Sequence, residues 1–216
     1  MVLTRSNDIH KGVWLRARDV SWQQVSGYGP PGFEAYARLR FLPDPEYQGQ
    51  PSSVHSRPDG GLAWEATQLQ AAVAALRQYS STPDRAFYCL WEGWGIAPDD
   101  FLRISWSTSA ASPDVVEESM DRAAWVTVGD RRCHLFEGSL DDFIWWGARE
   151  ETPSEDGPEV KFAFTWPADR AWCVAADVDL HWAGMGGSAH AIEALIGTPG
   201  LDVVEADPAS PVLWYD

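Results

Sequence analysis

Two aspartates and one histidine alternate along a short stretch in the C-terminal part of the chain. Asp177, Asp179 and His181 are each separated by a single residue. In a β-strand, side chains at alternate positions share one face and lie about 7 Å apart. Two carboxylates at that spacing could raise one another's pKa and form an acid–base pair, whereas a metal ion would need a further ligand from elsewhere. The alternative is a half-exposed strand that shows polar side chains to water.

Arg170 and two tryptophans are further candidates for ligand binding. Arg170 lies in the turn before this strand, where its guanidinium could hold an anion or pair with Asp169. Trp91 and Trp94 stand on either side of Gly93, at the end of another predicted strand. If they are exposed, these indoles could stack on a sugar, a base or a side chain of a partner. If they are buried, they fill the core.

A glycine-rich stretch, 184–187, leads towards Ser188 and a predicted helix. Free backbone N–H groups at such a junction can bind an anion. The stretch lacks the lysine of a P-loop and the spacing of a dinucleotide-binding fingerprint, so we interpret it as a tight connection with Ser188 as the helix cap. The sequence also lacks nucleophile-elbow, zinc-protease and Cys-x-x-Cys motifs. We therefore predict no cofactor and no metal, and we favour a protein that is not an enzyme.

The charge balance of the chain excludes some partners. There are 32 acidic and 16 basic residues, which gives a formal net charge of -16. Such a charge repels the phosphates of nucleic acids, and no cluster of lysine and arginine offsets it. A basic protein partner fits the charge better, although solubility alone would also account for it.

Hydropathy and cysteine content bear on the cellular compartment. No apolar run approaches the ~20 residues that span a bilayer, and the N-terminus has no signal-peptide core. Cys89, Cys133 and Cys173 are odd in number and far apart, which predicts reduced, buried thiols. The sequence therefore predicts a cytoplasmic protein that does not contact membranes.

Hydrophobic periodicity predicts the elements that would position these residues. Alternation predicts a half-buried strand over 35–41, and residues 86–92, which are apolar on both faces, predict a central strand. Apolar residues at helical spacing predict a helix over 65–79. The remaining predicted strands are 101–106, 125–128, 133–136, 161–166, 201–205 and 212–215, and the remaining predicted helices begin at Ser112, Ser139 and Ser188.

The strand that carries the alternating polar residues is predicted over 171–182. Its other face is an unbroken apolar row, which must meet the core. Because strands and helices do not alternate strictly, the sequence predicts an α+β fold with a mixed, largely antiparallel sheet and about four helices packed on it. We expect a single domain over residues 1–216, with surface loops at 43–61 and 149–159.

Two tryptophan-rich segments carry a family resemblance. Phe87–Gly95 contains Trp-Glu-Gly-Trp-Gly, and Trp166–Ala175 contains Trp-Pro-Ala-Asp-Arg-Ala-Trp-Cys and continues through Asp179 to Ser188. These segments resemble a group of uncharacterised actinobacterial proteins. The resemblance implies no known reaction or ligand, so it assigns no functional residues to this sequence.

Two classes of function remain open. Strong acidity, candidate exposed aromatics and the lack of a catalytic motif favour a non-enzymatic interaction protein, such as an immunity or antitoxin-like factor that masks a basic partner. The alternative is an enzyme, or a small-molecule or metal-binding protein, that uses the face of Asp177, Asp179 and His181 with Arg170 and Trp94. A flat, acidic, aromatic surface would favour the first class, and a concave pocket containing the three polar residues would favour the second.

Overall fold

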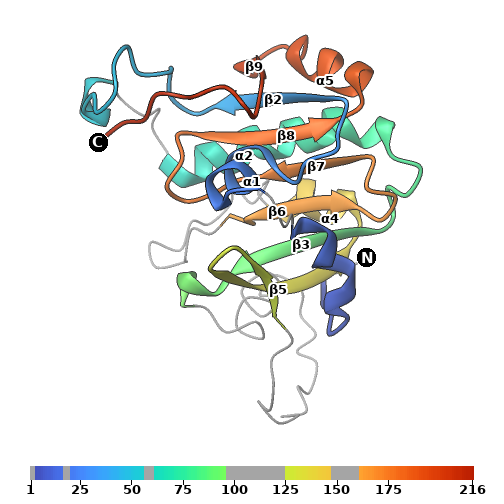
Figure 1. The fold of residues 1–216 in the computed structure, drawn as a ribbon. Helices are drawn as coiled ribbons and strands as arrows, with labels where there is room; N and C mark the ends of the chain where they lie inside the picture. The colour runs from blue at the N-terminus through green and yellow to red at the C-terminus, as the bar shows by residue number, and fades with distance from the viewer. Residues whose placement is uncertain (1–2, 17–19, 56–60, 96–124, 147–160) are drawn as a thin grey trace.

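A single antiparallel sheet organises the part of the chain that the structure describes (Figure 1). The structure is a computed structural model that describes residues 3–16, 20–55, 61–95, 125–146 and 161–216. Nine strands join in the order β1-β5-β3-β6-β7-β8-β2-β9, with β4 paired to β5, and all these pairings are antiparallel. The strands are β1 (Thr4–Arg5), β2 (Ala35–Arg40), β3 (Ala86–Trp91), β4 (Val126–Val128), β5 (Arg131–Gly138), β6 (Phe164–Pro167), β7 (Trp172–Ala175), β8 (Trp182–Gly187) and β9 (Val203–Ala206).

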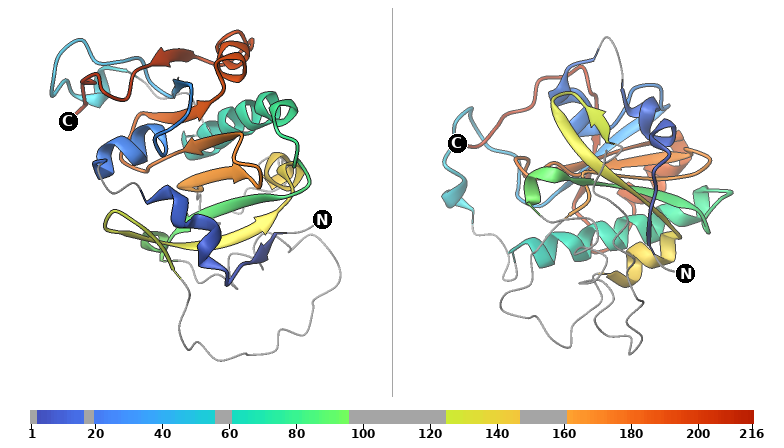
Figure 2. Two further views of the ribbon diagram at one scale, coloured as in Figure 1. Left: turned by 45° about the vertical axis from the view of Figure 1, so that its right-hand side comes forward. Right: turned by 90° about the horizontal axis from the view of Figure 1, so that it is seen from below.

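Helices cover both faces of this sheet (Figure 2). They are α1 (Trp22–Tyr28), α2 (Gly61–Leu76), α4 (Leu140–Trp146) and α5 (Ala189–Ile196), with the 3₁₀ turns η1 (Ile9–Leu15), η2 (Ser52–Val54), η3 (Arg77–Tyr79) and η4 (Glu92–Trp94). Helices α2, α4 and α5 pack on one face, whereas α1 and η1 pack on the other. The predicted α+β class with a largely antiparallel sheet is confirmed. None of the helices in the described ranges is long and apolar enough to cross a bilayer.

The side chains of β3 explain why both faces of the sheet are covered. Tyr88 and Leu90 point into the core that α2 closes, while Phe87 and Cys89 point into the core that α1 and η1 close. All four are at most 5% exposed. The prediction of an interior strand that is apolar on both faces is therefore confirmed. Its neighbours are β5 and β6, and the predicted partner strand 101–106 lies outside the described residues.

Periodicity also predicts the extent of several other elements. β2 fills the predicted strand 35–41, and α2 with η3 fills the predicted helix 65–79 but begins at Gly61. The predicted loop 43–61 is irregular apart from η2 and this first helical residue, and its residues 56–60 lie outside the described part. The predicted strands 125–128, 133–136, 161–166 and 201–205 appear as β4, β5, β6 and β9.

Two serines cap helices where the sequence predicts helix starts. Ser188 Oγ accepts a hydrogen bond of 3.2 Å from the N–H of Ala191 at the start of α5. Ser139 Oγ accepts one of 3.2 Å from the N–H of Asp142 at the start of α4. Each hydroxyl satisfies a backbone donor that has no partner within the helix, so both caps are local signals that tertiary packing preserves.

Of three further predicted segments, one prediction is wrong and two lie outside the described residues. Residues 212–215 form no strand, and Tyr215 makes only an isolated parallel bridge with Gln50. This segment bonds to the loop after β2 rather than to a sheet edge, so the prediction of a strand there is wrong. The predicted helix from Ser112 and the predicted loop 149–159 lie outside the described residues.

The predicted long strand over 171–182 is wrong, because β7 and β8 divide it and pair with each other as a hairpin. Asp177 lies in the connection, where its Oδ1 accepts a hydrogen bond of 3.0 Å from the N–H of Asp179 and so bends the chain. The alternating pattern continues through the loop because the loop is itself packed into the core, with Leu180 only 4% exposed. Asp177, Asp179 and His181 therefore do not share a strand face.

The glycine-rich stretch 184–187 is part of β8, so its interpretation as a tight connection is also wrong. A Cβ on Gly184 would lie 2.0 Å from the carbonyl oxygen of Gly27 in α1. A Cβ on Gly186 would lie 2.3 Å from the ring of Phe33. The missing side chains let α1 and the segment that follows it lie directly on the sheet.

Candidate functional site

Arg131, at the start of β5, binds both predicted acids. Its Nη2 lies 3.1 Å from Asp177 Oδ1 and 2.7 Å from Asp179 Oδ2. The Asp177 side chain is 5% exposed and that of Asp179 is 75% exposed, so one carboxylate is buried and the other faces water. Burial raises the pKa of Asp177, although the Asp179 N–H and the Arg131 guanidinium act against this. In this geometry both carboxylates are acceptors for one cation.

Two indoles enclose the guanidinium of Arg131. Its Cζ lies 4.2 Å from the ring centroid of Trp91 and 5.4 Å from that of Trp22. Trp94 packs edge-on against Trp91, with 6.4 Å between the ring centroids. Cation–π attraction therefore adds to the two ion pairs in holding Arg131. We define the Arg131 cluster as Trp22, Trp91, Arg131, Asp177 and Asp179.

His181 belongs to a separate network around Asp44. Its Nε2 is 3.5 Å from Asp44 Oδ1, which is too far for a good hydrogen bond. Asp44 Oδ2 accepts hydrogen bonds from Arg38 at 3.0 Å and Arg40 at 3.2 Å. Burial opposes ionisation of Asp44, but the two arginines outweigh it and lower the pKa of this carboxyl. The imidazole also packs against Tyr215, with 4.8 Å between the ring centroids.

Replacement of His181 by asparagine is expected to flatten the pH dependence of stability below neutrality. Burial, which outweighs the attraction of Asp44, lowers the pKa of His181 from 6.5 to about 4. The unfolded chain takes up this proton before the folded protein does, so the stability contributed by a neutral His181 is complete above pH 6.5 and is lost as the pH falls towards 4. At about 1.4 kcal/mol for each pKa unit, the loss approaches roughly 3 kcal/mol.

Urea unfolding of the wild type and His181→Asn at a series of pH values measures this effect. The free energies of unfolding of the two proteins should converge as the pH falls from neutrality towards 4, because only the wild type loses the contribution of a neutral imidazole. If the free energies of unfolding of the two proteins change with pH in parallel, the lowered pKa of His181 is contradicted.

Arg170 lies apart from both networks. Its Cζ is 5.2 Å from the ring centroid of Trp14, and its φ of 55° puts it in the left-handed region at the turn between β6 and β7. The neighbouring carboxylate of Asp169 accepts hydrogen bonds from the N–H of Ser81 at 2.6 Å and from its Oγ at 2.8 Å. The contacts of Ser81, rather than a salt bridge to Arg170, therefore hold this turn.

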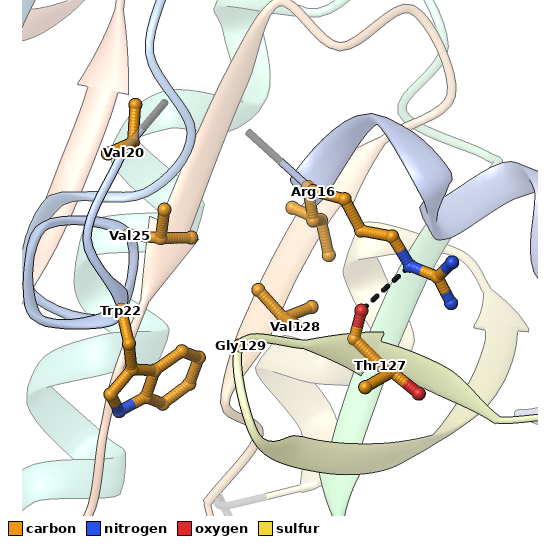
Figure 3. Close-up of a pocket in the computed structure, with 8 residues that line it drawn as sticks. Arg16, Val20, Trp22, Val25, Thr127, Val128 and Gly129 are labelled. Atoms are coloured by element: carbon orange, nitrogen blue, oxygen red, sulfur yellow. Dashed lines mark hydrogen bonds between the residues drawn. The ribbon is translucent and has the colours of Figure 1, made fainter. Parts of the chain in front are cut away.

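A pocket of about 350 Å³ opens between α1 and the β4–β5 hairpin (Figure 3). Arg16 stands at one side, where its Nε donates a hydrogen bond of 2.8 Å to the carbonyl oxygen of Thr127. Trp22 forms part of the wall and also faces Arg131, so the pocket adjoins the Arg131 cluster. The three predicted polar residues do not line it. The lining residues are Leu15, Arg16, Val20, Trp22, Val25, Thr127, Val128 and Gly129.

Comparisons with known proteins do not assign the chain to a family. Comparison with protein-family models, curated proteins and solved structures finds no match. The resemblance carried by the tryptophan-rich segments stays a prediction. Within the described ranges, no group of three or more His, Cys, Asp or Glu side chains is arranged to hold a metal ion.

The structure therefore assigns the predicted residues to three places. It brings Asp177, Asp179 and Trp91 to Arg131 and packs Trp94 against Trp91. It puts His181 beside Asp44 and leaves Arg170 on Trp14. Sequence reasoning missed Arg131, Trp22 and Asp44. The only local signal for Arg131 is its position between the predicted strands 125–128 and 133–136, and nothing local identifies its partners.

Proposed function

We propose that this chain is a non-enzymatic protein that binds a basic protein partner, as immunity and antitoxin-like factors do. The observation that carries the proposal is that most basic side chains of the described part form ion pairs with the protein's own carboxylates. Within the described ranges, Arg5, Arg16 and Arg170 form no ion pair. The basic side chains that do form ion pairs with carboxylates are Lys11, Arg38, Arg40, Arg77, Arg85, Arg131, Arg132 and Lys161.

In the described part of the chain, most basic side chains are therefore neutralised within the protein, whereas many carboxylates face solvent without a cation. The exposed carboxylates of the described part that have no ion pair are Asp8, Glu34, Glu46, Asp84, Asp130, Asp169, Glu193, Glu205, Asp207 and Asp216. Such a surface attracts a basic partner, accelerates its association and repels acidic competitors.

The Arg131 cluster favours binding over catalysis. Its carboxylates already hold a cation, and His181 lies in another network, so the three predicted residues do not form one reactive group. The partly exposed indoles of Trp91 and Trp22 offer rigid apolar area of the kind that protein interfaces use. The rival prediction, an enzyme or small-molecule-binding protein, gains no support from the pocket, which other residues line.

The cysteines fit a reducing compartment. Cys89, Cys133 and Cys173 are all unpaired and buried, and burial raises the pKa of the Cys173 thiol. Thiols of this kind are inert and need no oxidising environment. We therefore propose that the protein works in the cytoplasm.

Affinity capture followed by reconstitution tests this function. The protein is used as bait in a lysate of its source, the captured protein is purified, and the affinity of the pair is measured at increasing salt. We expect a basic partner whose Kd weakens by at least about tenfold between roughly 50 and 300 mM salt, because screening shortens the reach of the charges.

A parallel screen of metabolites and metal ions by thermal shift tests the rival. A ligand that raises the melting temperature of the wild type but not of Asp179→Asn would contradict the interaction proposal. Asp179 suits this comparison because its side chain is 75% exposed, so the variant keeps the fold.

A further inference from the structure

The strand β9 is the edge strand on one side of the sheet in the described part of the chain. It is last in the strand order and pairs only with β2 among the strands that the structure describes (Figure 1). The N–H of Arg40 donates to the carbonyl oxygen of Asp202 at 2.8 Å. Since hydrogen-bonded pairs alternate along an antiparallel ladder, Val204 and Ala206 bond to β2. The N–H and C=O groups of Val203 and Glu205 therefore point away from the sheet.

Acidic side chains outnumber basic ones around this edge. After Arg170 the chain contains no lysine or arginine. Glu205 lies on β9 itself, Asp207 follows it, and Glu193 is exposed on α5, which packs against β9. Asp202 is already paired with Arg40, at 2.7 Å. An approaching strand therefore meets unpaired carboxylates together with outward backbone donors and acceptors.

We propose that β9 is the docking strand for a basic, extended segment of the partner, which adds to the sheet as a further strand. This inference rests on the proposed function, because it names where the basic partner binds and in what conformation. The outward N–H and C=O groups of Val203 and Glu205 supply the main-chain bonds of strand addition. Lysine or arginine side chains of the incoming strand then lie beside Glu205 and Asp207.

The charge of the edge selects among possible occupants. A second copy of the chain would bring its own Glu205 and Asp207 next to those of the first, and like charges directly opposite one another destabilise strand pairing. An acidic or neutral strand gains no compensation for the carboxylates that it would approach. A basic strand is the occupant that the edge favours.

Hydrogen exchange of single amides gives a direct test. In the free protein, the amides of Val203 and Glu205 should exchange fast, whereas those of Val204 and Ala206 should be protected by β2. The probe is a short, capped peptide of alternating lysine and valine, with an alternating glutamate and valine peptide as its control. The basic peptide should bind and slow exchange at Val203 and Glu205, and the acidic peptide should do neither.

Two substitutions at Glu205 separate the backbone from the charge. Glu205→Pro removes an outward N–H and leaves the ladder to β2 intact, as an edge position allows, and we expect it to weaken peptide binding by more than about tenfold. Glu205→Gln keeps the N–H and removes only the charge, so its affinity for the basic peptide should fall by only about two- to fivefold. Asp130→Asn removes one exposed charge in the β4–β5 turn and should change the affinity less than about twofold.

The outcomes distinguish this inference from the proposed function. The basic peptide could bind without slowing amide exchange at Val203 and Glu205, and Glu205→Pro could bind it as tightly as the wild type does. That result would overturn the docking strand but would leave the proposed binding of a basic partner intact. If the basic peptide does not bind at low salt, the docking strand is overturned. The proposed function would then be decided by the affinity-capture experiment, through the charge of the captured partner. A dimer of the free protein that Glu205→Pro dissociates would show that the edge serves a second copy instead.

Discussion

Replacement of Lys161 by methionine is expected to lower the free energy of unfolding by about 3–5 kcal/mol. The Nζ of Lys161 lies 3.0 Å from Glu65 Oε2, and the two side chains are only 4% and 2% exposed. The ammonium also lies 5.3 Å from the ring centroid of Phe41. Methionine fills a similar volume but takes the ammonium of Lys161 away from the buried carboxylate of Glu65. The penalty is therefore the cost of breaking a buried ion pair rather than the cost of a cavity.

A double substitution provides the control for this effect. Lys161→Met combined with Glu65→Leu removes both charges and is expected to recover most of the lost stability, because a well-packed apolar pair often replaces a buried ion pair without cost. Urea unfolding of the wild type, both single variants and the double variant gives the coupling energy. A loss below about 1 kcal/mol in Lys161→Met would contradict the buried pair.

Replacement of Gly184 by alanine is expected to lower the free energy of unfolding by about 3 kcal/mol, near the top of the range for overpacking. The added Cβ would lie 2.0 Å from the carbonyl oxygen of Gly27 and 2.4 Å from the Cα of Tyr28. Both are backbone atoms, so no side chain can turn aside, and α1 must move off β8. For a chain of this size the melting temperature should fall by about 6–12 °C, measured by circular dichroism.

Gly187 offers a matched control on the same strand. A Cβ there meets nothing nearer than 3.4 Å, where the Cβ of Trp172 lies. Gly187→Ala is therefore expected to cost less than about 1 kcal/mol. Equal losses in the two alanine variants would show that close approach of α1 is not what requires Gly184.

Local sequence signals were sufficient for much of the fold. The alternation that predicts β2, the two-faced apolar pattern of β3 and the helical spacing of α2 each reflect burial along one element, and each prediction is confirmed. The serine caps at Ser139 and Ser188 need only neighbouring backbone groups, so they too could be predicted.

The hairpin of β7 and β8 shows where such signals fail. Period-two alternation indicates an extended, buried chain, but it does not reveal where that chain reverses if the turn is buried as well. Asp177 ends the extended run through a hydrogen bond to the N–H of Asp179, and a one-dimensional pattern cannot distinguish this from a continued strand. For that reason the prediction that Asp177, Asp179 and His181 share a strand face is wrong.

By itself the sequence determined the α+β class, the interior strand β3 and the acidity of the chain, since each depends on composition or on one local pattern. Tertiary structure alone decided that Arg131 joins Asp177 to Asp179 and that His181 turns to Asp44. Contacts of this kind join residues far apart along the chain, so no spacing in the sequence encodes them. The same holds for Gly184 of β8, which is required because α1, from a distant part of the chain, packs directly on it.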